Sequence, residues 1–243
     1  MIHYMFIFFL ILAILIYLLY ILLIIITPKQ YISIIIIFFS KIFIRTLRFK
    51  SLNIINIENY NKIKKKDYLI VSNHISLFDG IVLTAIFGNV CFLADINGLS
   101  IPGTKFINKK LGSVIINKKN KGNSHKIKEY VINNKNDNIL VIFPDGMDPI
   151  EPNKNIANFK SGAFKDGLDI LPIIIKYKDY KINPTFYWYK GENPIHGFSK
   201  MILDGNCNIH VKILNLEKKI KDETIDDYKE RIYNLMSNEY NNF

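Results

Sequence analysis

A long uncharged run near the N-terminus constrains this chain more than any other feature. Residues 4 to 26 have the sequence YMFIFFLILAILIYLLYILLIII, without a charged side chain. Coiled into a helix, the run is about 34 Å long, and the hydrocarbon core of a bilayer is about 30 Å thick. A cleaved signal peptide is the alternative, but it would have a shorter apolar part, a preceding Lys or Arg and a small-residue cleavage pattern. We therefore predict a membrane helix that ends at Thr27 and Pro28.

Basic residues follow this run, and no Lys or Arg precedes it. Those that follow most closely are Lys29, Lys41, Arg45, Arg48 and Lys50. Because an excess of Lys and Arg marks the cytoplasmic flank of a membrane helix, we expect the body of the protein on the cytoplasmic side.

A second apolar stretch, YISIIIIFFSKIFIRTLRF at residues 31–49, is too short before its first charge to be a second span. Lys41, Arg45 and Arg48 are three or four residues apart, so they fall along one side of a helix. This pattern favours a helix that lies in the membrane interface, with its cations near lipid phosphates. A re-entrant hairpin with the first helix is the alternative.

The length of 243 residues allows one mid-sized domain with a short appendage. We expect residues 1–50 to form the membrane anchor and interfacial helix, and residues 51–243 to form the folded domain. The formal charge of +11 suggests an anionic partner, such as a phospholipid surface, a phosphorylated metabolite or nucleic acid. Heavy use of Ile, Lys and Asn indicates AT-rich codons, so part of this charge carries no function. Cys91 and Cys207 have neither metal spacing nor a disulfide framework, which favours a reducing compartment.

Beyond residue 50, short apolar runs alternate with segments that suit helices. This alternation predicts an α/β domain with a mixed, largely parallel sheet flanked by helices, with its chemistry at the carboxyl ends of the strands. The predicted strands are Tyr68 to Ser72, Val90 to Leu93, Ser113 to Ile116, Asn138 to Phe143, Ile170 to Tyr177, Pro184 to Tyr189 and Asn208 to Leu214. The predicted helices are Leu77 to Phe87, His125 to Asn133, an amphipathic segment near Ala163, and Ile225 to Tyr240.

Polar residues interrupt the apolar pattern in VSNHISLFDGIVL, residues 71–83. A buried polar side chain without a partner costs about 1 to 3 kcal/mol, so His74 and Asp79 need a reason to be there. On a continuous helix the two would point about 140° apart, so they can meet only if His74 lies in a turn. Ser76 suits an N-cap position and Asp79 the acidic partner of a capping box.

Such a turn would place His74 between the end of a strand and the start of a helix. The imidazole could then take a proton from a hydroxyl through one nitrogen, while Asp79 holds the other and stabilises the imidazolium. The alternative is that Asp79 only caps the helix and His74 is an ordinary loop histidine.

Four blocks follow one another along the chain. The first is Asn73, His74 and Asp79; the second is GSVIINK, with Gly112, Ile116, Asn117 and Lys118; the third is FPDGMD, residues 143–148, followed by FKSGAF, residues 159–164; the fourth is LPIII around Pro172. Over roughly residues 45 to 240, in order and spacing, the chain resembles the glycerolipid acyltransferases of the lysophosphatidic acid acyltransferase (PlsC-like) family. Asn117 and Lys118 depart from that family's usual Asp-Arg.

The resemblance implies a role for each matching residue. His74 would deprotonate a glycerol hydroxyl, which attacks an acyl thioester directly, and Asp79 would orient His74. An alcohol is a poor nucleophile at neutral pH, whereas a thioester has a good leaving group, so a positioned base contributing roughly 10² to 10⁴ in rate suits this chemistry.

The resemblance also implies a set of substrate-binding residues. Lys118 would bind the acceptor's phosphate, Asp145 with Gly146 would hold its glycerol region, and Lys160 would add positive charge near the phosphate. The alternatives are a solvated surface lysine at Lys118, turn chemistry at Asp145 and Gly146, and simple exposure of Lys160.

We therefore expect a membrane-bound acyltransferase that transfers a fatty acyl group from acyl-CoA or acyl-carrier protein to lysophosphatidic acid, giving phosphatidic acid. Asp148 replaces a common arginine of the family and would repel a phosphate monoester, so reacylation of another lysophospholipid is the close alternative. A second alternative is a non-catalytic, membrane-tethered protein that binds anionic lipid through its lysines. A hydrolase with Ser76 as nucleophile is a further one.

No cofactor or metal is expected, because the sequence contains no metal cluster, no Gly-rich phosphate loop and no dinucleotide fingerprint. The acyl donor would enter as a co-substrate. The expected partners are membrane phospholipid, the lysophospholipid acceptor and the donor. Nucleic acid is not expected as a partner, since no recognition motif is present.

Overall fold

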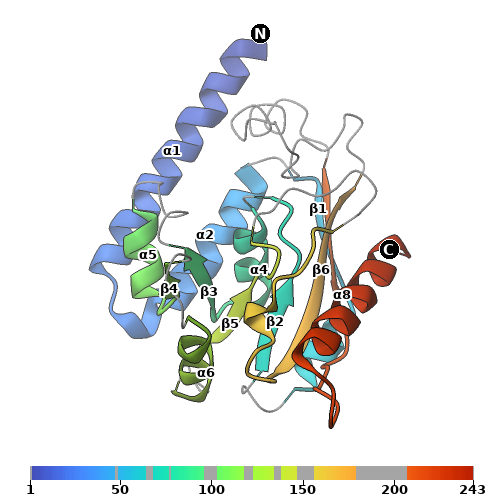
Figure 1. The fold of residues 1–243 in the computed structure, drawn as a ribbon. Coiled ribbons are helices and arrows are strands. Elements are labelled where there is room, and N and C mark those ends of the chain that lie inside the picture. Colours follow the sequence, from blue (N-terminus) through green and yellow to red (C-terminus); the bar gives the residue numbers. More distant parts are fainter. Residues whose placement is uncertain are drawn as a thin grey trace. The chain divides into compact units, whose positions relative to one another are not determined.

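The computed structural model describes most of the chain. The described residues are 2–46, 49–63, 68–76, 78–95, 103–117, 123–133, 138–146, 156–178 and 207–242, and Figure 1 shows their elements. The chain forms two compact units, each assembled from separate segments. The first unit comprises Met1–Asn53, Ile75–Asn89 and Tyr177–His210; the second comprises Ile54–His74, Val90–Lys176 and Val211–Phe243. The expected domain boundary at residue 50 stays a prediction.

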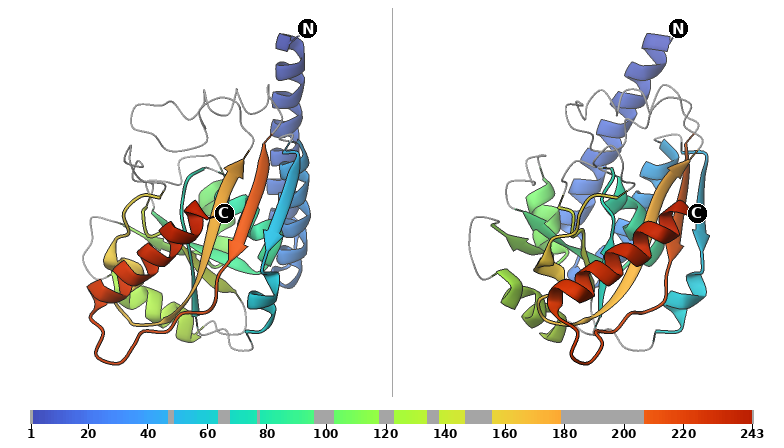
Figure 2. Two further views of the ribbon diagram at one scale, coloured as in Figure 1. Left: turned by 90° about the vertical axis from the view of Figure 1, so that its right-hand side faces the viewer. Right: turned by 45° about the vertical axis from the view of Figure 1, so that its right-hand side comes forward.

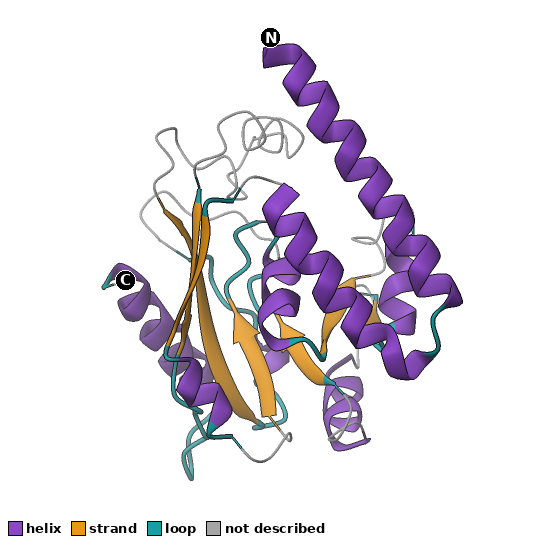
Figure 3. Ribbon diagram, turned by 180° about the vertical axis from the view of Figure 1, so that it is seen from behind, coloured by secondary structure: helices purple, strands orange, loops and turns teal. Residues whose placement is uncertain are grey.

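The first unit is built on helices. Helix α1 is Ile2–Ile26, the 3-10 turn η1 is Lys29–Tyr31, α2 is Ile32–Thr46 and α4 is Asp79–Phe87. Helix α1 ends just before Thr27 and Pro28, as predicted, since proline cannot continue a helix. Figure 3 shows α1 and α2 joined by the short η1 turn. Between these two helices, the ring of Tyr20 packs on that of Phe39 with 5.3 Å between centroids.

Both N-terminal helices expose large apolar side chains. Examples are Phe8, Ile11, Leu15, Leu18 and Leu22 on α1, and Ile34 and Phe38 on α2. A crossing helix needs about 20 consecutive apolar residues. Within the residues that the structure describes, which leave out the side chains of residues 2–6 and 9, no helix is both long and apolar enough to cross a bilayer. The predicted span from Tyr4 to Ile26 is therefore a helix, but its crossing of a membrane is not confirmed.

Helix α2 packs closely on the end of α4. Gly88 follows the last residue of α4 and has a φ of +72°, which favours glycine. A Cβ atom at Gly88 would lie 2.7 Å from Cδ1 of Ile37 on α2. The absence of a side chain at this position therefore permits the approach of the two helices.

A seven-stranded sheet forms the centre of the second unit, and its strands β1, β6 and β7 each have residues assigned to the first. The strand order is β1-β7-β6-β2-β5-β3-β4. The strands are β1 Ser51–Ile55, β2 Tyr68–Ser72, β3 Val90–Asp95, β4 Val114–Ile116, β5 Ile139–Ile142, β6 Asp169–Lys178 and β7 Asn208–Ile213. Strand β2 runs parallel to both β5 and β6, and β3 runs parallel to both β5 and β4. The prediction of an α/β fold with a largely parallel sheet is confirmed.

The helices of the second unit are α3 Ile57–Asn61, α5 Thr104–Lys110, α6 Asn123–Asn133 and α8 Ile225–Asn241, with a 3-10 turn, η3, at Ser161–Ala163. Helices α6 and α8 contribute buried residues to the core. Helix α8 lies across β6 (Figure 2). Its buried residues recur every four positions, at Tyr228, Ile232, Met236 and Tyr240, so one stripe of the helix packs on the sheet.

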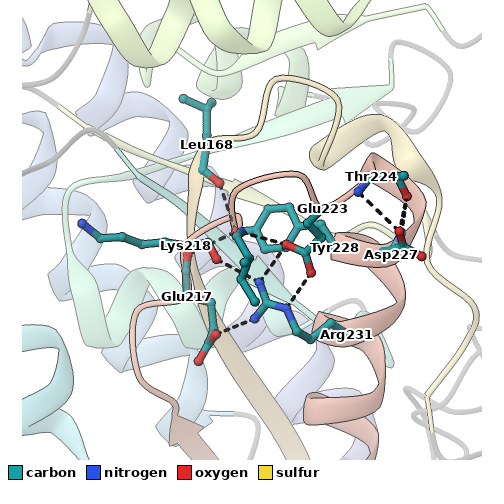
Figure 4. A network of polar contacts seen from close by, with 9 residues as sticks. Leu168, Glu217, Lys218, Glu223, Thr224, Asp227, Tyr228 and Arg231 are labelled. Atoms are coloured by element: carbon teal, nitrogen blue, oxygen red, sulfur yellow. Dashed lines mark hydrogen bonds and ion pairs between the residues drawn. The ribbon is translucent and has the colours of Figure 1, made fainter.

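A network of polar contacts joins the start of α8 to the segment before it (Figure 4). The guanidinium of Arg231 donates to the carboxylates of Glu217 and Glu223, at 2.7 Å and 2.8 Å. The hydroxyl of Tyr228 donates to the backbone carbonyls of Leu168 and Glu217, at 3.1 Å each. These contacts hold the N-terminal half of α8 beside the start of β6.

The predicted elements differ from the structure in several places. The helix expected from Leu77 begins at Asp79, and the segment near Ala163 forms only the short 3-10 turn η3. The predicted strand Pro184 to Tyr189 lies outside the described residues. Three elements were not predicted, namely β1, α3 and α5.

Candidate active site

Strand β2 ends at Ser72, and the side chain of Asn73 then makes the hydrogen bonds to β6 that the backbone of a further strand residue would make. The backbone pairing of β2 with β6 extends to Ser72 opposite Ile173. Beyond it, Asn73 Nδ2 donates to the carbonyl of Ile175, and the Ile175 N–H donates to Asn73 Oδ1, both at 2.9 Å. The amide group satisfies both backbone groups of Ile175, so the main chain is free to turn away from the sheet.

His74 follows directly and is held at both its backbone and its ring. Its backbone N–H donates to Asp145 Oδ2 at 2.7 Å. Its imidazole stacks on the ring of Phe143, with 4.3 Å between centroids and an angle of 21° between the planes. The stacking fixes the orientation of the imidazole ring.

The turn after β5 brings Asp145 to His74. Gly146 donates its N–H to the carbonyl of Phe143 at 3.0 Å and has a φ of +63°. A side chain at Gly146 would be strained, because L residues rarely adopt this conformation. Asp145 is fully buried, so its carboxylate points into the protein rather than to solvent.

The FKSGAF segment is tied to the same turn. The backbone N–H of Lys160 donates to the carbonyl of Pro144 at 2.9 Å, while the Lys160 side chain is exposed. Phe159 and Phe164 are buried on either side of it, and their rings stack 6.2 Å apart. The hydrophobic pair thus anchors the segment and leaves Lys160 at the surface beside the turn.

Asp79 lies in the first unit, at the start of α4, and is fully buried. Its Oδ2 accepts the backbone N–H groups of Ile75 at 2.7 Å and Ser76 at 2.8 Å. Its Oδ1 accepts the hydroxyl of Tyr177 at 2.8 Å. These donors fix the orientation of the carboxylate.

The prediction that Ser76 caps the helix is wrong. Phe78 occupies the N-cap position and makes no side-chain cap. The Ser76 Oγ instead accepts the N–H of Phe78 at 3.2 Å, inside the turn. The Asp79 carboxylate reaches back to the two N–H groups of residues 75 and 76, which closes the turn without a capping box.

The division between the two units falls between His74 and Ile75. The pairing of His74 with Asp79 spans this division and stays a prediction. Each residue has a fixed setting within its own unit, His74 on Asp145 and Phe143, and Asp79 on its own turn and Tyr177.

Not every predicted site residue is placed. Lys118 and Asp148 lie outside the described residues, and Gly112, which has a φ of +75°, and Asn117 of the second block lie within them. Among the described residues, no group of three His, Cys, Asp or Glu side chains is arranged to hold a metal ion.

Two roles escaped the sequence analysis. Asn73 was recognised only as part of a motif, and Tyr177 only as the end of a strand. One sequence feature pointed to Tyr177: its hydroxyl lies at the end of the mostly aliphatic run LPIIIKY. The structure buries this tyrosine, so its hydroxyl needs a partner. Burial raises the pKa of Tyr177 well above its ordinary value, and the neighbouring Asp79 raises it further. The phenol therefore stays protonated and remains a hydrogen-bond donor.

Comparisons with known proteins identify a family model and a curated relative. A family model described as Acyltransferase matches residues 52–176. A 1-acyl-sn-glycerol-3-phosphate acyltransferase of Saccharomyces cerevisiae is 25% identical over 189 residues, covering 72% of this chain and 60% of that protein. The chain thus spans about 60% of the length of this curated relative.

A solved structure has the same fold. It is the crystal structure of the 1-acyl-sn-glycerophosphate (LPA) acyltransferase, PlsC, from Thermotoga maritima, with a TM-score of 0.69 and 18% sequence identity. The superposition covers 98% of this chain and 94% of the other.

Proposed function

Because the chain belongs to the Acyltransferase family, we propose that it transfers a fatty acyl group from acyl-CoA or acyl-carrier protein to the free hydroxyl of lysophosphatidic acid, giving phosphatidic acid. The observation that carries this proposal is the fixed setting of His74, whose backbone donates to Asp145 and whose ring stacks on Phe143. A base held in this way loses little entropy when it meets a substrate hydroxyl.

In the proposed reaction, His74 takes the proton of the acceptor hydroxyl as its oxygen attacks the thioester carbonyl carbon. The new C–O bond forms a tetrahedral intermediate, and its collapse breaks the C–S bond. The thiolate of the donor leaves and takes the proton from the imidazolium, so His74 is restored without a covalent acyl-enzyme. The stacked ring of Phe143 and the carboxylate of Asp79 orient the imidazole.

Substrate binding by Lys118, Asp145, Gly146 and Lys160 is part of the proposal. The exposed Lys160 side chain lies beside the Pro144 turn, which suits contact with an acceptor phosphate. Asp145 is buried and accepts the His74 N–H, so its clearest contribution is to hold the His74 backbone.

We include membrane association in the proposal. The exposed stripe Ile34, Phe38, Lys41 and Arg45 follows one side of α2, apolar near its start and cationic near its end. Large exposed apolar patches mark membrane or protein interaction sites, and cations at one end suit lipid headgroups.

The activity is tested with labelled acyl-CoA and acyl-carrier protein donors against a panel of acceptors, lysophosphatidic acid and other lysophospholipids, in membranes that contain wild type or His74→Ala. The proposal expects product from lysophosphatidic acid with wild type only. Product from another lysophospholipid alone would correct the acceptor, and a wild type inactive with every pair would contradict the acyltransferase function.

Membrane association is tested by flotation with vesicles of neutral or anionic phospholipid. The double variant Ile34→Ser/Phe38→Ser is expected to weaken flotation on both kinds, and the exposed apolar side chains of α1 retain part of it. The variant Lys41→Gln/Arg45→Gln is expected to lose only the preference for anionic vesicles. Exposed Ile220 lies far along the sequence from α2, so Ile220→Ser is the matched control. Unchanged flotation of the Ile34→Ser/Phe38→Ser variant would contradict docking through α2.

A further inference from the structure

Tyr177 reaches Asp79 across 98 residues of sequence. It lies near the end of β6, and its hydroxyl donates to Asp79 Oδ1 at 2.8 Å. The other carboxylate oxygen accepts from the backbone N–H groups of Ile75 and Ser76. Two of these donors thus come from Asp79's own turn, and Tyr177 ties the carboxylate to strand β6.

Aromatic packing holds the Tyr177 ring. The centroid of the Phe49 ring lies 6.0 Å from that of Tyr177. The Phe49 ring also packs edge-on against Phe78, with 5.9 Å between centroids. Phe49 and Tyr177 are both buried. Since Phe78 immediately precedes Asp79, the three rings fix the phenol with respect to the turn that carries the carboxylate.

We propose that Tyr177 is a positioning residue for acyl transfer, because its hydroxyl fixes the Asp79 carboxylate in the orientation that holds the catalytic histidine. The inference rests on the proposed function. Two backbone N–H groups of the turn hold Oδ2 of Asp79. The hydroxyl of Tyr177 holds Oδ1, so it sets the plane of the carboxylate. Without it, Oδ1 would turn toward whichever donor is nearest, and the base would be oriented in fewer molecules.

The effect of Tyr177 on acyl transfer should pass through Asp79. The variant Tyr177→Phe keeps the ring and removes the hydroxyl that donates to Asp79. We expect kcat to fall roughly ten- to a hundredfold with little change in KM for either substrate, since no substrate contact is lost. The matched control is Tyr228→Phe, which removes a buried hydroxyl bonded to the carbonyls of Leu168 and Glu217 and should leave kcat unchanged.

A double-mutant cycle separates positioning from a general loss of structure. Wild type, Tyr177→Phe, Asp79→Asn and the double variant are compared by kcat, KM and thermal unfolding. If Tyr177 acts through Asp79, adding Tyr177→Phe to Asp79→Asn changes kcat by less than about twofold. If Tyr177→Phe does not fold, the variant Phe49→Leu, which removes the ring beside Tyr177, tests the same support and should lower kcat severalfold at unchanged KM.

The possible outcomes are distinct. Non-additive losses in kcat at constant KM would support the positioning role. An active wild type with an unaffected Tyr177→Phe, or with losses that add fully in the double variant, would overturn it. A wild type that transfers no acyl group would overturn the proposed function and the inference with it.

Discussion

Asp145 Oδ2 lies 2.7 Å from the backbone nitrogen of His74, so the carboxylate of one motif holds the main chain of another. The two residues are 71 positions apart in sequence and meet because β2 and β5 are neighbouring parallel strands. Each strand ends at the same edge of the sheet, where His74 meets the turn that follows β5. This contact explains why a buried acid follows β5.

Replacement of Asp145 tests this contact. In Asp145→Ala the partly buried N–H of His74 loses its acceptor, which should cost about 1 to 3 kcal/mol of unfolding free energy and lower acyl transfer at least tenfold. Asp145→Asn keeps an acceptor oxygen and should lose less of both. Urea unfolding and acyl-transfer assays give the two quantities. The control Asp169→Asn changes an acid at the start of β6, opposite the start of β2 and away from His74. It should leave activity intact. Equal activity of Asp145→Ala and wild type would contradict the role of this contact.

The amide of Asn73 should matter mainly for stability. Asn73→Ala removes both hydrogen bonds to the backbone of Ile175 and leaves two buried backbone groups unpaired. We expect a loss of about 2 to 4 kcal/mol in the free energy of unfolding, measured with urea. Asn73→Asp keeps the acceptor but not the donor and should be intermediate. A loss below about 0.5 kcal/mol in Asn73→Ala would show that water replaces the side chain.

The fold could be predicted where an apolar run is bounded by polar residues. Strand β2 has the predicted bounds, because all five of its residues are buried and Asn73 follows. The edge strand β1 was missed, because three of its five residues are exposed and it lacks an apolar run. The start of α4 was misplaced, because Ser76 and Asp79 have capping-box spacing although the carboxylate binds a turn and a distant tyrosine.

The candidate site was predictable only in part. The family resemblance, now confirmed, singled out His74, Asp79 and Asp145 from local sequence patterns. The partners of these residues were not predictable from local patterns. Strand pairing brings Asp145 to His74 and Tyr177 to Asp79. No local pattern encodes a contact that spans 71 or 98 residues.

The ion pair of Glu223 with Arg231 should make stability depend on pH. The hydrogen bond from Arg231 holds the pKa of Glu223 below its ordinary value of 4.5. A carboxylate with a lowered pKa stabilises the fold above its ordinary pKa, and this contribution is lost as pH falls through the folded value. Glu223→Gln should therefore be less stable than wild type near pH 7 by under about 1 kcal/mol, with the difference shrinking as pH falls below 4.5. Thermal unfolding at several pH values measures this, and a difference that persists unchanged at pH 3 would contradict it.

Cys91 should be inert in the native protein. Burial raises the pKa of its thiol to about 12, and the thiol donates a hydrogen bond to the hydroxyl of Tyr130. At pH 8 about one molecule in 10⁴ would carry the reactive thiolate. We expect iodoacetamide to leave Cys91 unmodified in the native state and to label it in urea, as measured by mass spectrometry of its peptide. Rapid labelling of Cys91 without denaturant would contradict this.

The central claim is that His74 is the general base, and its most direct test is the rate of acyl transfer by His74→Ala beside the control His210→Ala. The measurement uses equal amounts of folded protein in membranes, with the acceptor and donor that serve wild type best. The account predicts that His74→Ala loses about 10² to 10⁴ in kcat while His210→Ala keeps wild-type activity. Retention of full activity by His74→Ala would contradict the account.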